Sequence, residues 1–237
     1  MGSILLHYGI KPDLIFMSHQ HHDIFESRKQ FQLERIILFS DAVFAIAITL
    51  LIIEIKVPHF ENVTQQELAY ELRHKLPEFL GFILSFAVIG QFWISHHRLF
   101  GCIINYTAKL MWLNLLMLLW VVVMPFSTFL NMQYGNMDIV WFWYSINLAL
   151  IELAYYLLWK YVGSKPELCY MAGDKKFISY MYRRCIITFF IFLAGGLCTL
   201  LPWVGVKWSS RFIFFLIFPA IAILRKNYNK HNKKAAI

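Results

Sequence analysis

The fold of this chain is decided by residues 35–53, which have the sequence Arg-Ile-Ile-Leu-Phe-Ser-Asp-Ala-Val-Phe-Ala-Ile-Ala-Ile-Thr-Leu-Leu-Ile-Ile. The stretch is apolar from Ala42 onward, but a guanidinium, a hydroxyl and a carboxylate stand near its beginning. A charged side chain at the centre of a membrane helix costs about 2.5–3.5 kcal/mol on insertion scales and is a functional signal by default. We therefore expect a membrane-spanning helix in which Arg35, Ser40 and Asp41 have partners elsewhere in the fold.

The rest of the chain has the composition of a membrane protein with several spans. Of its 237 residues, 59% are hydrophobic and 15% are charged, and the mean hydropathy is +0.55. The apolar residues form blocks close to the ~20 residues that cross a ~30 Å hydrocarbon core, and they lack the period-two alternation of barrel strands. We expect an all-α membrane protein with spans at about 33–57, 76–100, 107–131, 137–160, 183–204 and 208–225.

The positions of the lysines and arginines predict the orientation. With six spans both termini lie on one side of the membrane, and 17 of the 22 cations fall on that side. The positive-inside rule therefore places the N-terminal tail, residues 1–32, and the basic C-terminal tail, residues 226–237, in the cytoplasm. Loops facing anionic lipid explain the net charge of +8, so we expect membrane lipid and no nucleic acid as a partner.

The sequence also lacks the common motifs of enzymes and of voltage-gated channels. It has no P-loop, no H-E-x-x-H and no G-x-S-x-G, which are motifs of nucleotide-dependent and hydrolytic enzymes. It has no Thr-Val-Gly-Tyr-Gly filter and no arginine ladder in a span, as voltage-gated potassium channels have. Because the loops are short, we expect a function within the membrane, with no catalysis, organic substrate or cofactor.

Several motifs resemble those of one family. Arg35-x-x-x-Phe39-Ser40-Asp41 resembles the first-helix signature of the transmembrane protein 175 family, the lysosomal potassium channels and their prokaryotic relatives. The next two spans carry further resemblances: Ser85-Phe86, Phe92-Trp93-x-x-His96-His97-Arg98-Leu99-Phe100, Asn114-Leu115-Leu116 and Pro125-Phe126-Ser127-Thr128. The resemblance covers about residues 33–224 and leaves the N-terminal tail outside.

The resemblance implies a potassium-preferring cation channel with passive conduction, in which helix one lines the pore and no re-entrant filter loop is present. Animal members of the family carry two six-span repeats and form dimers. This chain has one set of six spans without internal duplication, so it resembles the single-repeat prokaryotic members, which are homotetramers. The expected location is the plasma membrane of a prokaryote, and the expected transported ion is K⁺.

The helical geometry of the first span gives candidate pore residues. At 100° per residue, Ile46, Leu50 and Ile53 form one stripe, and Asp41 lies about 140° from Ile46. In a tetramer, four copies of this stripe would form apolar rings, and such rings close a pore by dewetting. We expect the constriction and selectivity at Ile46, Thr49, Leu50 and Ile53, with K⁺ near the first three. Without the resemblance, such a stripe far more often belongs to core or lipid-facing packing. The hydroxyl of a threonine in a membrane helix, such as Thr49, usually bonds to a carbonyl oxygen of its own helix.

Asp41 needs a partner at equal depth, and residue counting brings the N–H donors of Trp93 and His96 on the second span near that level. We expect a structural polar network between helices one and two that holds the pore helix. Its predicted members are Arg35, Phe39, Ser40, Asp41, Trp93 and His96. Arg35 itself is either a ring charge at the cytoplasmic mouth or an anchor to lipid phosphate.

Two other functions fit the composition. A proton-coupled secondary transporter could use Asp41, His96 and Glu152, because histidine titrates near neutral pH. Such transporters usually have paired repeats with broken helices, whereas no glycine or proline interrupts residues 33–57. A catalytically inert membrane scaffold is the other alternative, but it gives no reason for the Arg-x-x-x-Phe-Ser-Asp group.

Overall fold

The computed structural model describes residues 12–53, 55–57, 64–202, 205 and 212–235. The secondary structure of these residues is helical, and the all-α fold class is confirmed. The elements, in chain order, are α2 (Pro12–Ile53), α3 (Gln65–His74), α4 (Leu76–Phe100), α5 (Ala108–Tyr134), α6 (Asp138–Gly163), α7 (Lys175–Thr199), the 3₁₀ helix η2 (Ile213–Leu216) and α9 (Ile217–Ala235).

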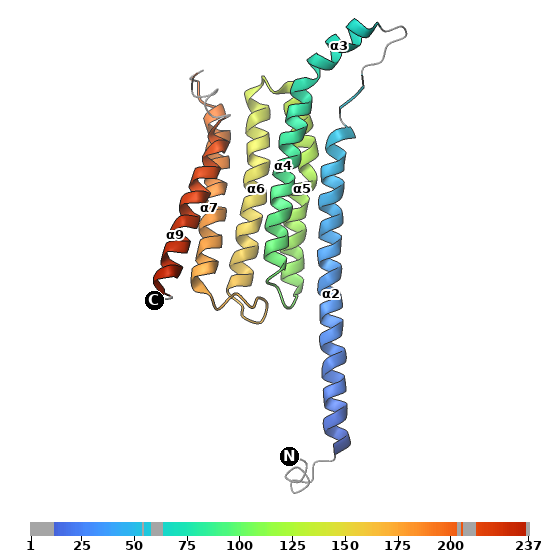
Figure 1. The fold of residues 1–237 in the computed structure, drawn as a ribbon, viewed down its shortest axis with the longest axis vertical. Helices are drawn as coiled ribbons and strands as arrows, with labels where there is room; N and C mark the ends of the chain where they lie inside the picture. Colours follow the sequence, from blue (N-terminus) through green and yellow to red (C-terminus); the bar gives the residue numbers. More distant parts are fainter. Residues whose placement is uncertain (1–11, 54, 58–63, 203–204, 206–211, 236–237) are drawn as a thin grey trace.

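The long helices alternate in direction along the chain (Figure 1), so that α2 runs antiparallel to its neighbour α4 and parallel to its neighbour α5. The centre of the bundle is α4, α5, α6 and α7, in which α6 packs against both α5 and α7. On one side α2 packs against α4 and α5, and on the other side α9 packs against α7. The helix α2 begins, and α9 ends, toward the same end of the bundle (Figure 1).

Five helical segments of the described chain are long and apolar enough to cross a membrane: Ser27–Ile53, Leu76–Phe100, Ala108–Tyr134, Asp138–Gly163 and Lys175–Thr199. They overlap the first five predicted spans. Of the sixth, residues 208–211 lie outside the described residues, and residues 213–225 belong to η2 and the first half of α9. The α2 helix starts at Pro12, well inside the predicted tail, because no glycine or proline interrupts residues 13–57.

Local side chains determine where two of these helices begin. The hydroxyl of Thr107 accepts a hydrogen bond from the backbone N–H of Leu110 at the start of α5. The carboxylate of Asp174 accepts from the N–H groups of Lys176 and Phe177 at the start of α7. Such caps satisfy N–H groups that have no partner within a helix. The cap at Asp174 starts α7 eight residues before the predicted span at 183.

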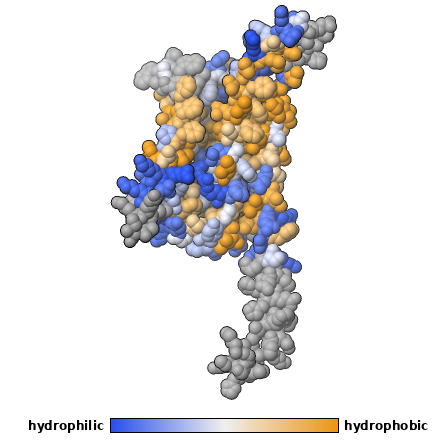
Figure 2. All heavy atoms as spheres, in the orientation of Figure 1, coloured by the Kyte–Doolittle hydropathy of each residue, from blue (hydrophilic) through white to orange (hydrophobic). Residues whose placement is uncertain are grey.

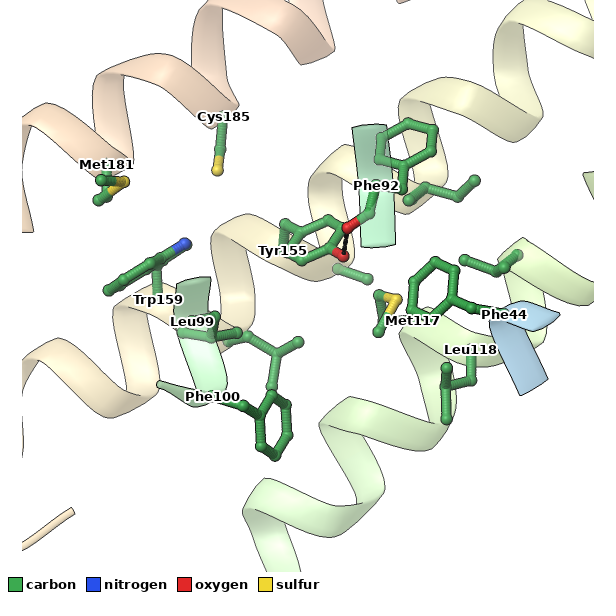
Figure 3. Close-up of a cluster of buried hydrophobic side chains, with 14 of the residues drawn as sticks. Phe44, Phe92, Leu99, Phe100, Met117, Leu118, Tyr155, Trp159, Met181 and Cys185 are labelled. Atoms are coloured by element: carbon green, nitrogen blue, oxygen red, sulfur yellow. Dashed lines mark hydrogen bonds between the residues drawn. The ribbon is translucent and has the colours of Figure 1, made fainter. Parts of the chain in front are cut away.

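A continuous apolar core joins α2 to the centre of the bundle (Figure 3). Phe44 of α2 is 1% exposed and points toward Met117 and Leu118 of α5 (Figure 3). In the middle of the core, the hydroxyl of Tyr155 on α6 donates a 2.6 Å hydrogen bond to the carbonyl oxygen of Phe92 on α4. The core therefore fixes the positions of α2, α4, α5 and α6 relative to one another.

We predict that Tyr155→Phe destabilises the bundle by about 1–2 kcal/mol, because a buried hydrogen bond between α4 and α6 is lost while the apolar packing of the ring is kept. Unfolding of the purified protein in increasing SDS measures the change. Tyr170→Phe is the matched control, because Tyr170 is 64% exposed. Equal stability of the two variants would show that the Tyr155 bond contributes nothing to the fold.

Candidate functional site

One face of α2 packs into the bundle. Phe44, Ala47 and Leu51 are each only 1% exposed, and they follow the three- and four-residue spacing of one helix face. Ile48, on the flank of this face, is partly buried against the same core. Contacts with α4 and α5 therefore set the rotation of α2 about its own axis.

The opposite face of α2 is uncovered. We call Ile46, Leu50 and Ile53 the apolar stripe; they are 58%, 40% and 68% exposed. Thr49, beside the stripe, is also exposed, and its hydroxyl is 3.0 Å from the carbonyl oxygens of both Ala45 and Ile46. Its proton is thus held within the helix, while the oxygen keeps acceptor capacity toward a cation.

A buried chain of hydrogen bonds joins three helices, and we call its members Ser40, Asn114 and His96 the polar clamp. His96 Nε2 of α4 lies 3.0 Å from Asn114 Oδ1 of α5, and Asn114 Nδ2 donates to Ser40 Oγ of α2 over 2.9 Å. Ser40 Oγ in turn donates to the Ile36 carbonyl oxygen. The three side chains are at most 2% exposed, so the polar clamp holds α2 through bonds that water does not replace.

The geometry of the polar clamp defines the proton position on His96. Asn114 uses its amide nitrogen to donate to Ser40, so its oxygen accepts from His96, and Nε2 carries the imidazole proton. His96 Nδ1 is buried and has no hydrogen-bond partner among the described residues. A second proton there would be a buried donor without an acceptor, which is costly. This geometry favours a structural imidazole over a proton relay.

The carboxylate of Asp41 lies in a separate contact. Trp93 Nε1 of α4 donates to Asp41 Oδ1 over 2.9 Å, and Trp93 is 40% exposed. The bond therefore lies at the outer edge of the α2–α4 contact, and within the described chain no hydrogen bond joins Asp41 to His96. Arg35 and Phe39 are exposed on α2, and no bond in the described part of the chain ties them to the polar clamp.

Asn114 is the member of the polar clamp that is absent from the predicted network, because that network contains only residues of helices one and two. The signal was present, since Asn114 stands within the apolar run Leu110–Leu118 of the third span. A polar side chain in the middle of a membrane helix usually bonds to a neighbouring helix. Its partner lies 74 residues away on α2, however, and no spacing along the chain identifies it.

A second polar group joins the helices behind α2. Thr128 Oγ1 of α5 donates to Ser85 Oγ of α4 over 3.0 Å, and Ser85 Oγ lies 3.4 Å from the hydroxyl of Tyr144 on α6. Ser127 of α5 donates to Asn147 Oδ1 of α6 over 3.1 Å. These bonds tie α4, α5 and α6 to one another at a second level of the bundle.

Glu152, the third residue of the alternative transporter, lies elsewhere in the fold. It is on α6, close enough to Arg184 and Cys185 of α7 to interact with both. Arg184 also donates to Ser95 Oγ of α4 over 3.0 Å. No bond within the described residues joins Glu152 to Asp41 or His96. The structure does not bring the three residues together into a relay.

Comparison with known proteins gives the family. A sequence profile described as endosomal/lysosomal potassium channel TMEM175 matches residues 35–125. A potassium channel of Chamaesiphon minutus is 34% identical over 153 residues, which cover 63% of this chain and 75% of that protein. The chain belongs to the TMEM175 family.

Two further comparisons support the membership. A potassium channel of Streptomyces collinus is 37% identical over 129 residues, which cover 53% of this chain and 62%, less than two thirds, of that protein. The crystal structure of a lysosomal potassium-selective channel TMEM175 homologue from Chamaesiphon minutus superposes with a TM-score of 0.68 at 27% identity. That superposition covers 81% of this chain and 98% of the homologue, so the TMEM175 fold extends over nearly the whole bundle.

We predict that Asp41→Ala reduces assembly before it changes ion preference. The substitution leaves the Trp93 N–H without its acceptor and loosens α2 on α4. Size-exclusion chromatography with light scattering measures the fraction of oligomer. Glu34→Ala, which removes an exposed carboxylate from the same helix, is the control. Normal assembly of Asp41→Ala with an altered K⁺/Na⁺ preference would instead place this carboxylate on the ion path.

Proposed function

We propose that the protein is a potassium-preferring cation channel that conducts K⁺ passively down its electrochemical gradient. The observation that carries the proposal is the division of α2 into a face held by the bundle and an uncovered apolar stripe. Membership of the TMEM175 family and the two relatives named potassium channels support it. No cofactor and no catalytic step are needed for passive conduction.

We further propose a homotetramer in the plasma membrane of a prokaryote. One chain supplies a single α2, and a sealed pathway needs several copies of it around an axis. Because α2 lies at the edge of the bundle (Figure 1), its uncovered face is available to other copies. The helix α2 begins, and α9 ends, toward the end of the bundle where most cations lie, so both termini belong in the cytoplasm by the positive-inside rule.

The apolar stripe would form stacked rings in such an assembly. At a rise of 1.5 Å per residue, Ile46 and Ile53 are about 10 Å apart along the axis. A narrow apolar neck excludes the water that an ion carries, so the rings would limit conduction and demand dehydration. The Thr49 oxygen, between the Ile46 and Leu50 rings, could accept a partly dehydrated K⁺.

The polar clamp would give this pore its orientation. A slip of one residue along α2 rotates each side chain by 100° and would turn the apolar stripe toward the bundle. The buried bond from Asn114 to Ser40 and the outer bond from Trp93 to Asp41 oppose that rotation from two sides. In this proposal Asp41 and His96 position the pore helix, and the proton-coupled transporter is not favoured.

The tetramer is tested by mass. We predict that the purified protein has four times the 28.1 kDa mass of the chain, because four stripes close the pathway. Native mass spectrometry after release from detergent measures the stoichiometry, and cross-linking in membranes checks that purification did not create it. A monomer that still conducts K⁺ in liposomes would refute the assembly without refuting channel function.

We predict that Ile46→Asn increases ion flux several-fold and weakens the discrimination between K⁺ and Na⁺. A polar side chain in the neck stabilises water there and removes the ring that forces dehydration. Leu50→Asn and Ile53→Asn should act in the same direction, because they belong to the same apolar stripe. The flux of K⁺ and of Na⁺ from liposomes at matched protein amounts measures the increase in flux and the change in K⁺/Na⁺ preference.

Ile48→Asn is the matched control for the flux experiment. Ile48 lies about 160° from Leu50 on α2 and packs against the core, so its substitution should lower the yield of folded protein without increasing flux. A large gain of flux in Ile48→Asn, together with unchanged flux and selectivity in Ile46→Asn, would show that the other face of α2 lines the pore.

A further inference from the structure

A basic cleft lies between the start of α7 and the second half of α9, far from α2. Its volume is about 700 Å³, and four cations line it: Lys175, Lys176 and Arg183 from α7 and Lys230 from α9. Figure 2 shows hydrophilic residues gathered over the lower part of these two helices, below an apolar surface. The cleft contains no residue of the apolar stripe or of the polar clamp.

Within the described residues, no ion pair neutralises a cation of the basic cleft, and the nearest carboxylate in the chain, that of Asp174, caps the start of α7. The ion pairs of the described residues are Lys75 with Glu78 and Lys165 with Glu167, and neither includes a cation of the cleft. Beside it, Arg98 lies close enough to Arg184 and Arg225 for their charges to act on it. Cations brought together from two helices repel one another unless an anion lies between them, and a phosphate group offers several acceptor oxygens to such a set.

The walls of the basic cleft are held in place by aromatic packing. The rings of Tyr180 on α7 and Tyr228 on α9 stack with their centroids 4.9 Å apart and an interplanar angle of 25°. Both tyrosines line the cleft together with Ser179 and Asn227, which add polar donors. The stack joins the two helices at the cleft, so the cations are presented from a packed contact between α7 and α9.

The position of the basic cleft favours a lipid over a soluble anion. On α7, Lys176, Arg183, Ile186 and Phe190 lie within about 80° of one another at 100° per residue. Ile186 is 37% exposed and Phe190 is 58% exposed, so the basic surface continues into an exposed apolar one along the membrane span. An amphiphile with its phosphate among the cations would lay an acyl chain along these side chains.

We propose that the basic cleft binds the phosphate headgroup of an anionic phospholipid from the cytoplasmic leaflet. Basic pockets between membrane helices on the cytoplasmic side suit such headgroups. The inference rests on the proposed orientation but not on ion conduction, so a protein that conducts nothing could still bind lipid here. A bound lipid would contact both α7 and α9 and would hold α9 on the bundle.

The experiment uses full-length protein in detergent. Short-chain dioctanoyl phosphatidylglycerol, dioctanoyl phosphatidylcholine and inorganic phosphate are titrated separately, and binding is followed by microscale thermophoresis. The variant is Lys176→Gln with Arg183→Gln. The matched control, Lys109→Gln with Lys160→Gln, removes two exposed cations from the same end of the bundle. All four side chains are exposed, and light scattering checks that both variants assemble like the parent protein.

We expect the parent protein to bind phosphatidylglycerol at least about tenfold more tightly than phosphatidylcholine. The cleft variant should lose roughly 10- to 30-fold in affinity for phosphatidylglycerol, since each cation near a lipid surface contributes a factor of about five, and the control should change less than about twofold. Equal losses of affinity in both variants would show that general surface charge attracts the lipid and would contradict a site in the basic cleft. Inorganic phosphate binding as tightly as the lipid, or no loss in the cleft variant, would overturn the lipid assignment.

Discussion

The hydrogen bond from Asn114 to Ser40 is the contact on which the arrangement of α2 depends. In the interior of a membrane bundle no water replaces a lost partner, so a polar side chain there is strongly bound to its neighbour. This bond ties the first helix to the third, and His96 on the second helix fixes the amide of Asn114 from the other side. One amide thus adds directional bonds between three helices whose positions the apolar core also fixes.

The two faces of α2 follow from that constraint. Once Ser40 points to Asn114, helical geometry directs Phe44, Ala47 and Leu51 into the same groove between α4 and α5. The small side chain of Ala47 lets the backbone approach closely, as small residues do in membrane helix contacts. The apolar stripe then faces away from the bundle as a geometric consequence, and its three side chains stay exposed.

The sequence predicts most of the fold because membrane spans are set by local composition. Apolar runs of about 20 residues mark five of the helices, and counting residues from the span ends brought Asp41 and Trp93 to the same depth, where the structure has their hydrogen bond. The predicted span at 183 begins later than α7 because the cations at 175–176 and 183–184 resemble a loop in composition, whereas the Asp174 cap begins the helix before them.

The remaining features depend on which helices are neighbours, and no periodicity contains that information. Depth along the spans predicts His96 as a partner of Asp41, but the ring stacks on Phe100 with centroids 4.3 Å apart and bonds to Asn114 of α5. The basic cleft is hidden for the same reason. Its cations come from segments about 50 residues apart in the chain, and only the packing of α9 on α7 brings them together.

Membrane helices gain little from burying apolar surface against one another, because lipid tails are as apolar as the side chains they replace. In the proposed tetramer, the apolar stripe therefore supplies shape and packing for assembly, but no hydrophobic driving force. Association is favoured because the orientation of α2 is set within each chain. A helix held at Ser40 and Asp41 loses little further rotational freedom when it meets its copies, and such preorganisation lowers the entropic cost of association. The polar contacts inside each chain thus shape the proposed pore without lining it. They determine which face of α2 is exposed before the subunits assemble.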